Sequence, residues 1–353
     1  HRDLHSFPTR RSSDLTLNAR YSHTSLALRY LYANLHELQQ SSQILEFVIN
    51  SSPQIIAEEI LSHSPKIVGI GVYIWNAYDV GEIVKVIKKV LPQTIVILGG
   101  PEVSYTPFRV NFDMADYIIS GEGEESFYTL CKEILEGNQP KERTIKSKGV
   151  DFTAIKLPYD YYTDFDIQNR HIYVESSRGC PFECEFCLSS IDLKMRYLPL
   201  EVILSELEKL WVRGARNFKF IDRTFNVKIS YAKAILEYFL SKNEEYFIHF
   251  EVIPDNFPDE LKEMLKLFPP HCLQLEVGIQ TLNLGIAKNI KRNLKLEKIK
   301  ENLRFLENET KAHLHVDLII GLPGESIESF AANLDELYAL TKCEIQLGIL
   351  KKL

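Results

Sequence analysis

The chain has 353 residues, of which 45% are hydrophobic, and carries a formal net charge of −7 at pH 7. A chain of this length is expected to form two globular domains rather than one core. The acidic balance disfavours nucleic acid as a partner. No apolar stretch approaches the ~20 residues that span a bilayer, so we expect no membrane association.

Both ends of the sequence are unusual. Residues 1–15 show neither apolar periodicity nor the apolar core of a signal peptide. They resemble translated sequencing-adapter sequence, so we expect a non-native segment with few contacts to the folded core, and a first strand that is truncated or missing. A strand-like segment at 344–350 is followed by only three residues. We therefore interpret the sequence as a fragment that is also truncated at its C-terminus.

A first domain is predicted for residues 16–141, where short apolar runs alternate with amphipathic segments. This alternation indicates an α/β fold with a Rossmann-like, doubly wound parallel sheet. The ligand crevice of such a sheet lies at the carboxyl ends of its strands. The expected strands are 43–49, 66–74, 94–98 and 116–119, and the expected helices are 53–63, 79–91 and 124–135.

Glycines follow several of these strands, and glycine lets a flat ligand approach the backbone closely. The alternative is ordinary strand-to-helix turns, with Glu122 favouring a helix N-terminus by about 0.3–1 kcal/mol. The candidate cofactor-binding residues of this domain are Gly71, Gly99, Gly100, Gly121 and Glu122.

A linker at 142–170 leads to a second domain at 171–353, which opens with a CxxxCxxC motif formed by Cys180, Cys184 and Cys187. Structural zinc sites use four protein ligands, and no fourth ligand is near. An iron–sulfur cluster held by three thiolates keeps one iron open for a substrate or cofactor. The alternatives are incidental cysteines, or zinc completed by a distant ligand.

The other three cysteines, Cys131, Cys272 and Cys343, are scattered singly along the chain. This pattern is not a disulfide framework. Because an iron–sulfur cluster also needs a reducing environment, the cytoplasm is the expected compartment.

Strand–helix alternation continues to the end of the second domain and predicts a partial (β/α)6 barrel, whose chemistry would lie at the carboxyl ends of its strands. Polar residues and a glycine occur at those ends. The candidates are Asp222, Thr224, Glu251, Glu276, Gln280 and Gly321. Alternatively, the carboxylates are paired charges of the barrel rim, and the Gly321–Gly324 segment is a plain turn.

The cysteine motif and its flanks, residues 177–188, resemble the cluster loop of the radical S-adenosylmethionine (radical SAM) superfamily. The resemblance implies a 4Fe–4S cluster on the three cysteines, with SAM bound at the open iron and cleaved to a 5′-deoxyadenosyl radical. It also implies SAM contacts from 222–226, from Glu251 or the strand around Glu276 and Gln280, and from 321–324. Lys291-Arg292 resembles the basic dipeptide of this family, or forms a solvated pair of charges.

The first domain, from about residue 18 to residue 135, resembles the cobalamin-binding domains that precede radical SAM barrels. Many such domains carry a DxHxxG motif whose histidine ligates cobalt. Here the only candidate is His23, with Tyr21 in place of the Asp and Leu26 in place of the Gly. The resemblance therefore implies cobalamin without a protein histidine ligand, whereas His23 is equally explained as a hydrogen-bonded histidine before a helix.

Together these features predict a cobalamin-dependent radical SAM enzyme that transfers a methyl group to an unactivated carbon. The alternatives are radical cyclisation or rearrangement, methylthiotransferase-like RNA modification, and a degenerate sheet domain that acts as a docking module. The expected partners are a small-molecule or peptide substrate and an electron donor such as flavodoxin or ferredoxin. The residues that touch the substrate are not identified by the sequence.

Overall fold

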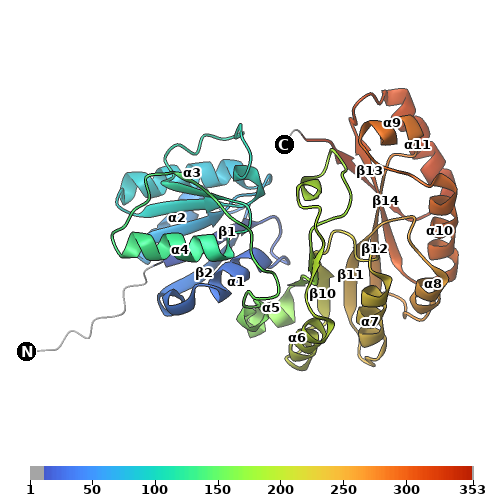
Figure 1. Ribbon diagram of the computed structural model, residues 1–353, viewed down its shortest axis with the longest axis horizontal. Coiled ribbons are helices and arrows are strands. Elements are labelled where there is room, and N and C mark those ends of the chain that lie inside the picture. The colour runs from blue at the N-terminus through green and yellow to red at the C-terminus, as the bar shows by residue number, and fades with distance from the viewer. Residues whose placement is uncertain (1–11, 352–353) are drawn as a thin grey trace, which may run out of the picture. The chain divides into compact units, whose positions relative to one another are not determined.

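The computed structural model describes residues 12–351, and only the backbone of residues 12–14 (Figure 1). The chain divides into two compact units between His171 and Ile172. No helix among the described residues combines the length and the apolar character needed to cross a membrane.

The first unit contains a six-stranded, entirely parallel sheet in the order β2-β1-β3-β4-β5-β6. Helices join consecutive strands, as predicted, except between β4 and β5, where the long connection contains only a short 3-10 helix at Pro101–Val103. The elements are β1 (Ser12–Asn18), α1 (Leu26–Ala33), β2 (Ser42–Val48), α2 (Pro53–Ser62), β3 (Ile67–Gly71), α3 (Ala77–Val90), β4 (Ile95–Gly99), β5 (Tyr117–Ser120), α4 (Glu124–Leu135), β6 (Thr144–Lys146) and α5 (Asp164–Asn169).

Strand β1 lies inside the sheet, paired with β2 on one side and β3 on the other. The expectation that residues 12–15 make few contacts, and that the first strand is missing, is therefore wrong. The side chains of Leu15 and Leu17 are completely buried, which accounts for the strand's central place. Residues 1–11 of the segment expected to be non-native lie outside the described residues.

Each face of this sheet is covered by helices. On one face, Leu15, Val68 and Val96 pack with buried residues of α2 and α3. On the other, Ile67, Ile97 and Ile119 pack with buried residues of α4. The strand order reverses between β1 and β3, and the carboxyl ends of strands at such a switch point form the ligand crevice of open α/β sheets.

The second unit contains an open, entirely parallel six-stranded sheet in the order β14-β13-β12-β11-β10-β7. Helices alternate with its strands, which confirms the predicted partial barrel (Figure 1). The elements are β7 (Ile172–Val174), β8 (Ser177–Arg178), β9 (Arg196–Tyr197), α6 (Leu200–Val212), β10 (Asn217–Phe220), α7 (Ile229–Leu240), β11 (Phe247–Val252), α8 (Asp259–Lys266), β12 (Leu273–Gln280), α9 (Leu284–Asn289), α10 (Leu296–Glu309), β13 (His313–Ile320), α11 (Ile327–Leu340) and β14 (Glu344–Ile349).

The two faces of this sheet differ in polarity. Along β12 every second side chain, from Leu273 to Ile279, is buried, and the alternate residues are only partly buried. Strand β13 shows the same alternation. Because successive side chains of a strand point to opposite faces, Glu276 and Asp317 share the polar face with His315. This face positions the candidate site.

Candidate cluster and cofactor site

The three cysteines of the motif lie on one loop, residues 179–187, here named the cysteine loop. It follows β8, which pairs antiparallel with β9. The backbone amide of Cys180 donates to the carbonyl of Asp192 at 2.9 Å. Gly179 has a φ of +89°, and a Cβ there would collide with the carbonyl oxygen of Lys194. The turn into the cysteine loop therefore requires glycine.

The far side of the cysteine loop is anchored to the segment after β12. The amide of Glu185 donates to the carbonyl of Ile290 at 3.1 Å, and the Glu185 carboxylate pairs with Lys291 at 2.7 Å. Phe186 packs against a small apolar cluster formed by Ile286, Ile290 and Leu322. Contacts at both ends therefore hold the loop in place.

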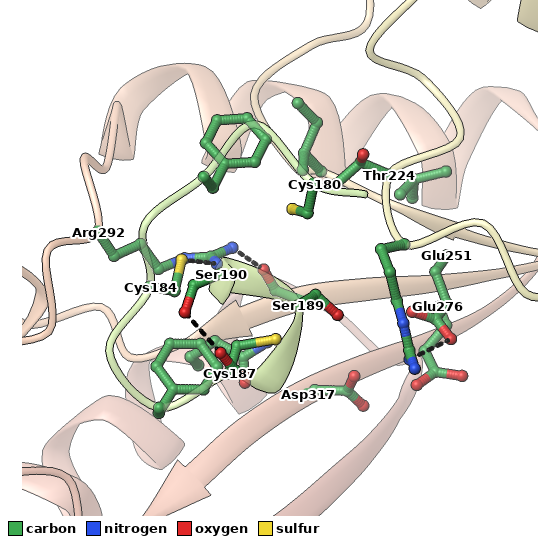
Figure 2. Close-up of a pocket in the computed structure, with 17 residues that line it drawn as sticks. Cys180, Cys184, Cys187, Ser189, Ser190, Thr224, Glu251, Glu276, Arg292 and Asp317 are labelled. Carbon is green, nitrogen blue, oxygen red and sulfur yellow. Dashed lines mark hydrogen bonds and ion pairs between the residues drawn. The ribbon is translucent and has the colours of Figure 1, made fainter. Parts of the chain in front are cut away.

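The three cysteines line one pocket, which has a volume of about 680 Å³ including its open mouth (Figure 2). Cys180 and Cys184 are buried, Cys187 is partly buried, and all three are free thiols. Burial, together with the neighbouring thiols of Cys187 and Cys184, raises the pKa of Cys180. In Figure 2 the three sulfur atoms face a common space, as a shared cluster requires.

The opposite wall of the pocket is built by the carboxyl ends of the neighbouring strands. The candidates Thr224, Glu251, Glu276 and Gln280 all line it. The Thr224 hydroxyl is buried and has no hydrogen-bond partner among the described residues. A buried polar atom of this kind is commonly completed by a ligand or water. Residues from three separate segments are thus brought to the three thiols.

Asp222 was expected in this wall but does not line the pocket. Its buried carboxylate accepts a hydrogen bond from the amide of Ser176 at 3.0 Å and from the hydroxyls of Ser176 at 2.6 Å and Ser177 at 2.5 Å. Burial raises the pKa of Asp222, whereas these hydrogen bonds lower it. Asp222 therefore supports the strand that enters the cysteine loop. Gly321, with a φ of +90°, is likewise outside the pocket lining.

Two carboxyl groups in the pocket have pKa values near neutral. Burial raises the pKa of Glu251 to about 7, with Arg223 at 3.8 Å partly opposing the shift. Burial and the adjacent Glu276 raise the pKa of Asp317 to about 7. The pKa of Glu276 is lowered, chiefly by its hydrogen bond to His249 at 3.1 Å. The wall therefore combines an ionised carboxylate with two groups that exchange protons near pH 7.

Asp317 and Arg292 are pocket residues that the candidate set omitted. The Arg292 guanidinium lies 3.7 Å from the Cys184 sulfur and also donates to the Gly278 carbonyl. Of the basic dipeptide, Arg292 reaches the pocket while the Lys291 side chain pairs with Glu185. Asp317 lies on the same face of the sheet as Glu276, at the position of β13 that pairs with Gly278 of β12.

In the first unit, the glycines lie at or just after the carboxyl ends of β3, β4 and β5, as predicted. Gly100 has a φ of +107°, and a Cβ there would meet the Val72 carbonyl oxygen 2.6 Å away. Gly99 has open space, with its nearest contact, the Ile119 carbonyl, at 3.9 Å. Gly71 adjoins Thr16, and Gly121 has a φ of +93°. Of these glycines, Gly99 has open space around it, which leaves room for a flat ligand at the end of β4.

Glu122 and His23 have structural partners. A Glu122 carboxylate oxygen accepts a hydrogen bond from the Val150 amide at 2.9 Å, so Glu122 holds a returning loop rather than facing open space. His23 lies two residues before Ser25, the N-cap of α1. Its carbonyl accepts a hydrogen bond from Asn18, and its backbone forms an isolated bridge with His171. These contacts fit the reading of His23 as a structural histidine before a helix.

Comparison with known protein families gives two matches. The model of the radical SAM superfamily matches residues 174–337, and the B12-binding domain matches residues 12–130. The second match begins at the start of β1. Both matches coincide with the units described above, and radical SAM domains imply a 4Fe–4S cluster and SAM.

Individual proteins are similar over much of the chain. An uncharacterised methyltransferase, PH0819 of Pyrococcus horikoshii, is 26% identical over 89% of this chain and 74% of its own length. The ribosomal protein uS12 methylthiotransferase RimO of a Nitratiruptor species is 27% identical, but over only 46% of this chain and 39% of its own.

A solved structure shares the fold. It is the radical SAM methyltransferase TsrM of Kitasatospora setae with cobalamin and a [4Fe-4S] cluster bound, at a TM-score of 0.75, 17% identity, 97% coverage of this chain and 72% of TsrM. The two family matches and this shared fold agree with the cysteine loop and the parallel sheets. The chain therefore carries a radical SAM domain, preceded by a B12-binding domain.

Proposed function

We propose that this protein is a cobalamin-dependent radical SAM methyltransferase that acts on an unactivated carbon of a small-molecule or peptide substrate. One observation carries the proposal: the three thiols of the cysteine loop line the same pocket as the polar carboxyl ends of β11, β12 and β13. The relatives' names support methyl transfer, since one is called a methyltransferase. Electrons would come from a donor such as flavodoxin or ferredoxin, in the reducing environment of the cytoplasm.

The donor set fits the iron–sulfur cluster that the radical SAM domain implies. Cys180, Cys184 and Cys187 supply three thiolates, and no other cysteine or histidine is among the residues that line the pocket. Three thiolates on a four-iron cluster leave one iron without a protein ligand. When bound, the cluster supplies the electron that cleaves SAM, and cobalamin carries the methyl group.

The pocket wall would hold SAM through polar groups that have few other partners. The Thr224 hydroxyl and one oxygen of Asp317 are buried and have no hydrogen-bond partner among the described residues. Glu276 stays ionised because of His249 and so suits a cationic amino or sulfonium group. Glu251 and Asp317, with pKa values of about 7, can each hold or release a proton at a carboxyl oxygen during turnover.

Three side chains would control the cluster's surroundings. Arg292 places a positive charge 3.7 Å from the Cys184 sulfur, which stabilises a thiolate there. Phe182 and Phe186 line the same pocket and limit the access of water. Hydrogen bonds to sulfur and solvent exposure are the protein's main controls on cluster potential.

The first unit would hold cobalamin at the carboxyl ends of its strands, near the switch point between β1 and β3. The open space at Gly99 supports this placement. Because the His23 ring packs edge-to-face against the His171 ring, with centroids 6.2 Å apart, we propose that it does not ligate cobalt. Gly71 and Gly121 would border the corrin.

The test is anaerobic reconstitution with iron, sulfide, cobalamin and SAM carrying a labelled methyl group, followed by incubation with a metabolite extract. We expect corrinoid absorbance bands, 5′-deoxyadenosine or S-adenosylhomocysteine, and label on a carbon of one product. Cys343→Ala, which alters a partly exposed thiol outside the pocket, should behave as the parent protein. Absence of corrinoid bands would favour a docking role for the first unit.

A second candidate is methylthio transfer, which the similarity to RimO over the radical SAM part favours. The net charge of −7 weighs against an RNA substrate. Mass spectrometry of the labelled product separates the two reactions, because methylthio transfer adds sulfur with the methyl group. A product that gains sulfur would overturn the methyltransferase proposal.

A further inference from the structure

Two histidines and a glutamate converge at the amino-terminal ends of β13 and β14, apart from the pocket. His313 and His315 lie on β13, and Glu344 is the first residue of β14. Their three ligand atoms, the two Nε2 atoms and one carboxylate oxygen, all lie within 4.8 Å of one another. Residues 313 and 315 point to the same face of β13 because side chains alternate along a strand.

The distances between these three atoms are close to the distances between neighbouring ligand atoms of a bound metal ion. The two Nε2 atoms are 2.8 Å apart, and the Glu344 Oε2 atom lies 3.0 Å from Nε2 of His315 and 3.5 Å from that of His313. Tetrahedral zinc holds nitrogen and oxygen at about 2.0–2.2 Å, which places neighbouring ligand atoms roughly 3.3 Å apart. Small rotations of these side chains would therefore admit an ion.

The cross-strand register favours this arrangement. His315 is directly paired with Glu344 in the parallel ladder between β13 and β14. The backbone thus fixes one imidazole opposite the carboxylate, and His313 adds the second imidazole from two residues earlier. The side chains of His313 and Glu344 are more than half exposed, at 55% and 58%, so an ion can reach them from solvent.

The group is separate from the cluster pocket. His313 precedes the pocket residue Asp317 by four residues along β13, and a strand rises about 3.3 Å per residue. His315 lies nearer, two residues from Asp317 and paired in register with the pocket residue Glu276, so the group lies on the same face of the sheet as the pocket and toward the amino-terminal end of β13. None of the three residues lines the pocket.

We propose that His313, His315 and Glu344 form a binding site for a divalent transition-metal ion, with Zn²⁺ as the best match. Two imidazoles and one carboxylate suit zinc, and three protein ligands leave one coordination position for water. The ion would link β13 to β14, the outermost described strand of the sheet. Its binding would therefore stabilise the folded state by mass action.

The experiment uses the full chain with the three pocket cysteines replaced by alanine, which removes the thiols of the cluster pocket as competing ligands. Calorimetric titration with Zn²⁺ should show one site, and Co²⁺ should give visible absorbance of a four-coordinate complex. Addition of Zn²⁺ should also raise the unfolding temperature. This parent protein tests the metal site without depending on the proposed function.

His315→Ala and, separately, Glu344→Gln should weaken Zn²⁺ binding at least tenfold and abolish the rise in unfolding temperature. His63→Ala, which alters a histidine at the end of α2 in the other unit, is the matched control and should bind as the parent does. Circular dichroism verifies that each variant is folded. No Zn²⁺ binding by the folded parent, or equal affinity in His315→Ala and His63→Ala, would overturn the proposal.

Discussion

The buried carboxylate of Asp222 accepts hydrogen bonds from both the amide and the hydroxyl of Ser176, at 3.0 and 2.6 Å. This contact ties the end of β10 to the segment that leads from β7 into the cysteine loop. The residue was expected to contact a cofactor, but it instead supports the residues that would do so. These hydrogen bonds explain why an acidic residue is tolerated at a fully buried position.

Asp222→Asn should destabilise the protein, because the amide turns one acceptor into a donor that faces the donors of Ser176 and Ser177. A buried donor or acceptor without a partner costs about 1–3 kcal/mol. Urea unfolding measures the loss, and the reconstituted variant should also retain less iron. Asp335→Asn, at an exposed position of α11, is the control and should change neither quantity. Equal stability of the two variants would contradict the supporting role.

Glu251→Gln should stabilise the cofactor-free protein relative to the wild type, and this difference in unfolding free energy should grow as pH rises. Burial raises the pKa of Glu251 to about 7 from an ordinary value of 4.5. The folded state therefore binds a proton that the unfolded state releases, and the wild-type protein loses this stability as pH rises from about 4.5 through 7. Unfolding free energies of the two proteins should converge below pH 4.5 and diverge up to pH 8. A difference that does not vary with pH would contradict the raised pKa.

Arg292→Ala should shift the midpoint potential of the proposed cluster to more negative values. Loss of a cation 3.7 Å from the Cys184 sulfur disfavours the added electron. Each ~1.4 kcal/mol of lost stabilisation corresponds to about 59 mV for one electron. A redox titration followed by electron paramagnetic resonance measures the shift. Lys291→Ala, which removes the adjacent cation paired with Glu185, should have a smaller effect, and equal shifts would show that only net charge matters.

Gly99→Leu should abolish corrinoid binding while His23→Ala leaves it nearly unchanged. The leucine side chain would fill the open space at the end of β4, whereas the His23 ring packs edge-to-face against the His171 ring. Equilibrium dialysis with cobalamin measures both affinities, and thermal unfolding verifies that each variant is folded. A large loss in His23→Ala alone would show that this histidine is the lower ligand of cobalt.

The features of the fold and the site that could be predicted from the sequence depend on local patterns. The spacing of Cys180, Cys184 and Cys187, and the alternation of strands with helices, are visible without a structure. Strand β1 was missed because Ser12–Asp14 are polar, and only pairing with β2 and β3 makes their backbone part of a central strand. The roles of the other site residues depend on contacts with residues distant in the sequence, which local patterns do not reveal. Asp222 accepts a hydrogen bond from Ser176, and Glu122 accepts one from Val150. The Arg292 guanidinium lies beside the Cys184 sulfur.

The most direct test of the account is the iron content and SAM cleavage of the variant in which Cys180, Cys184 and Cys187 are all replaced by alanine. After anaerobic reconstitution, the wild-type protein should hold one [4Fe–4S] cluster and, with reductant, release product from SAM. The triple variant should lose the iron and the cleavage together while remaining folded. Full iron content in the triple variant would contradict the account, because the cluster would then be held by other residues.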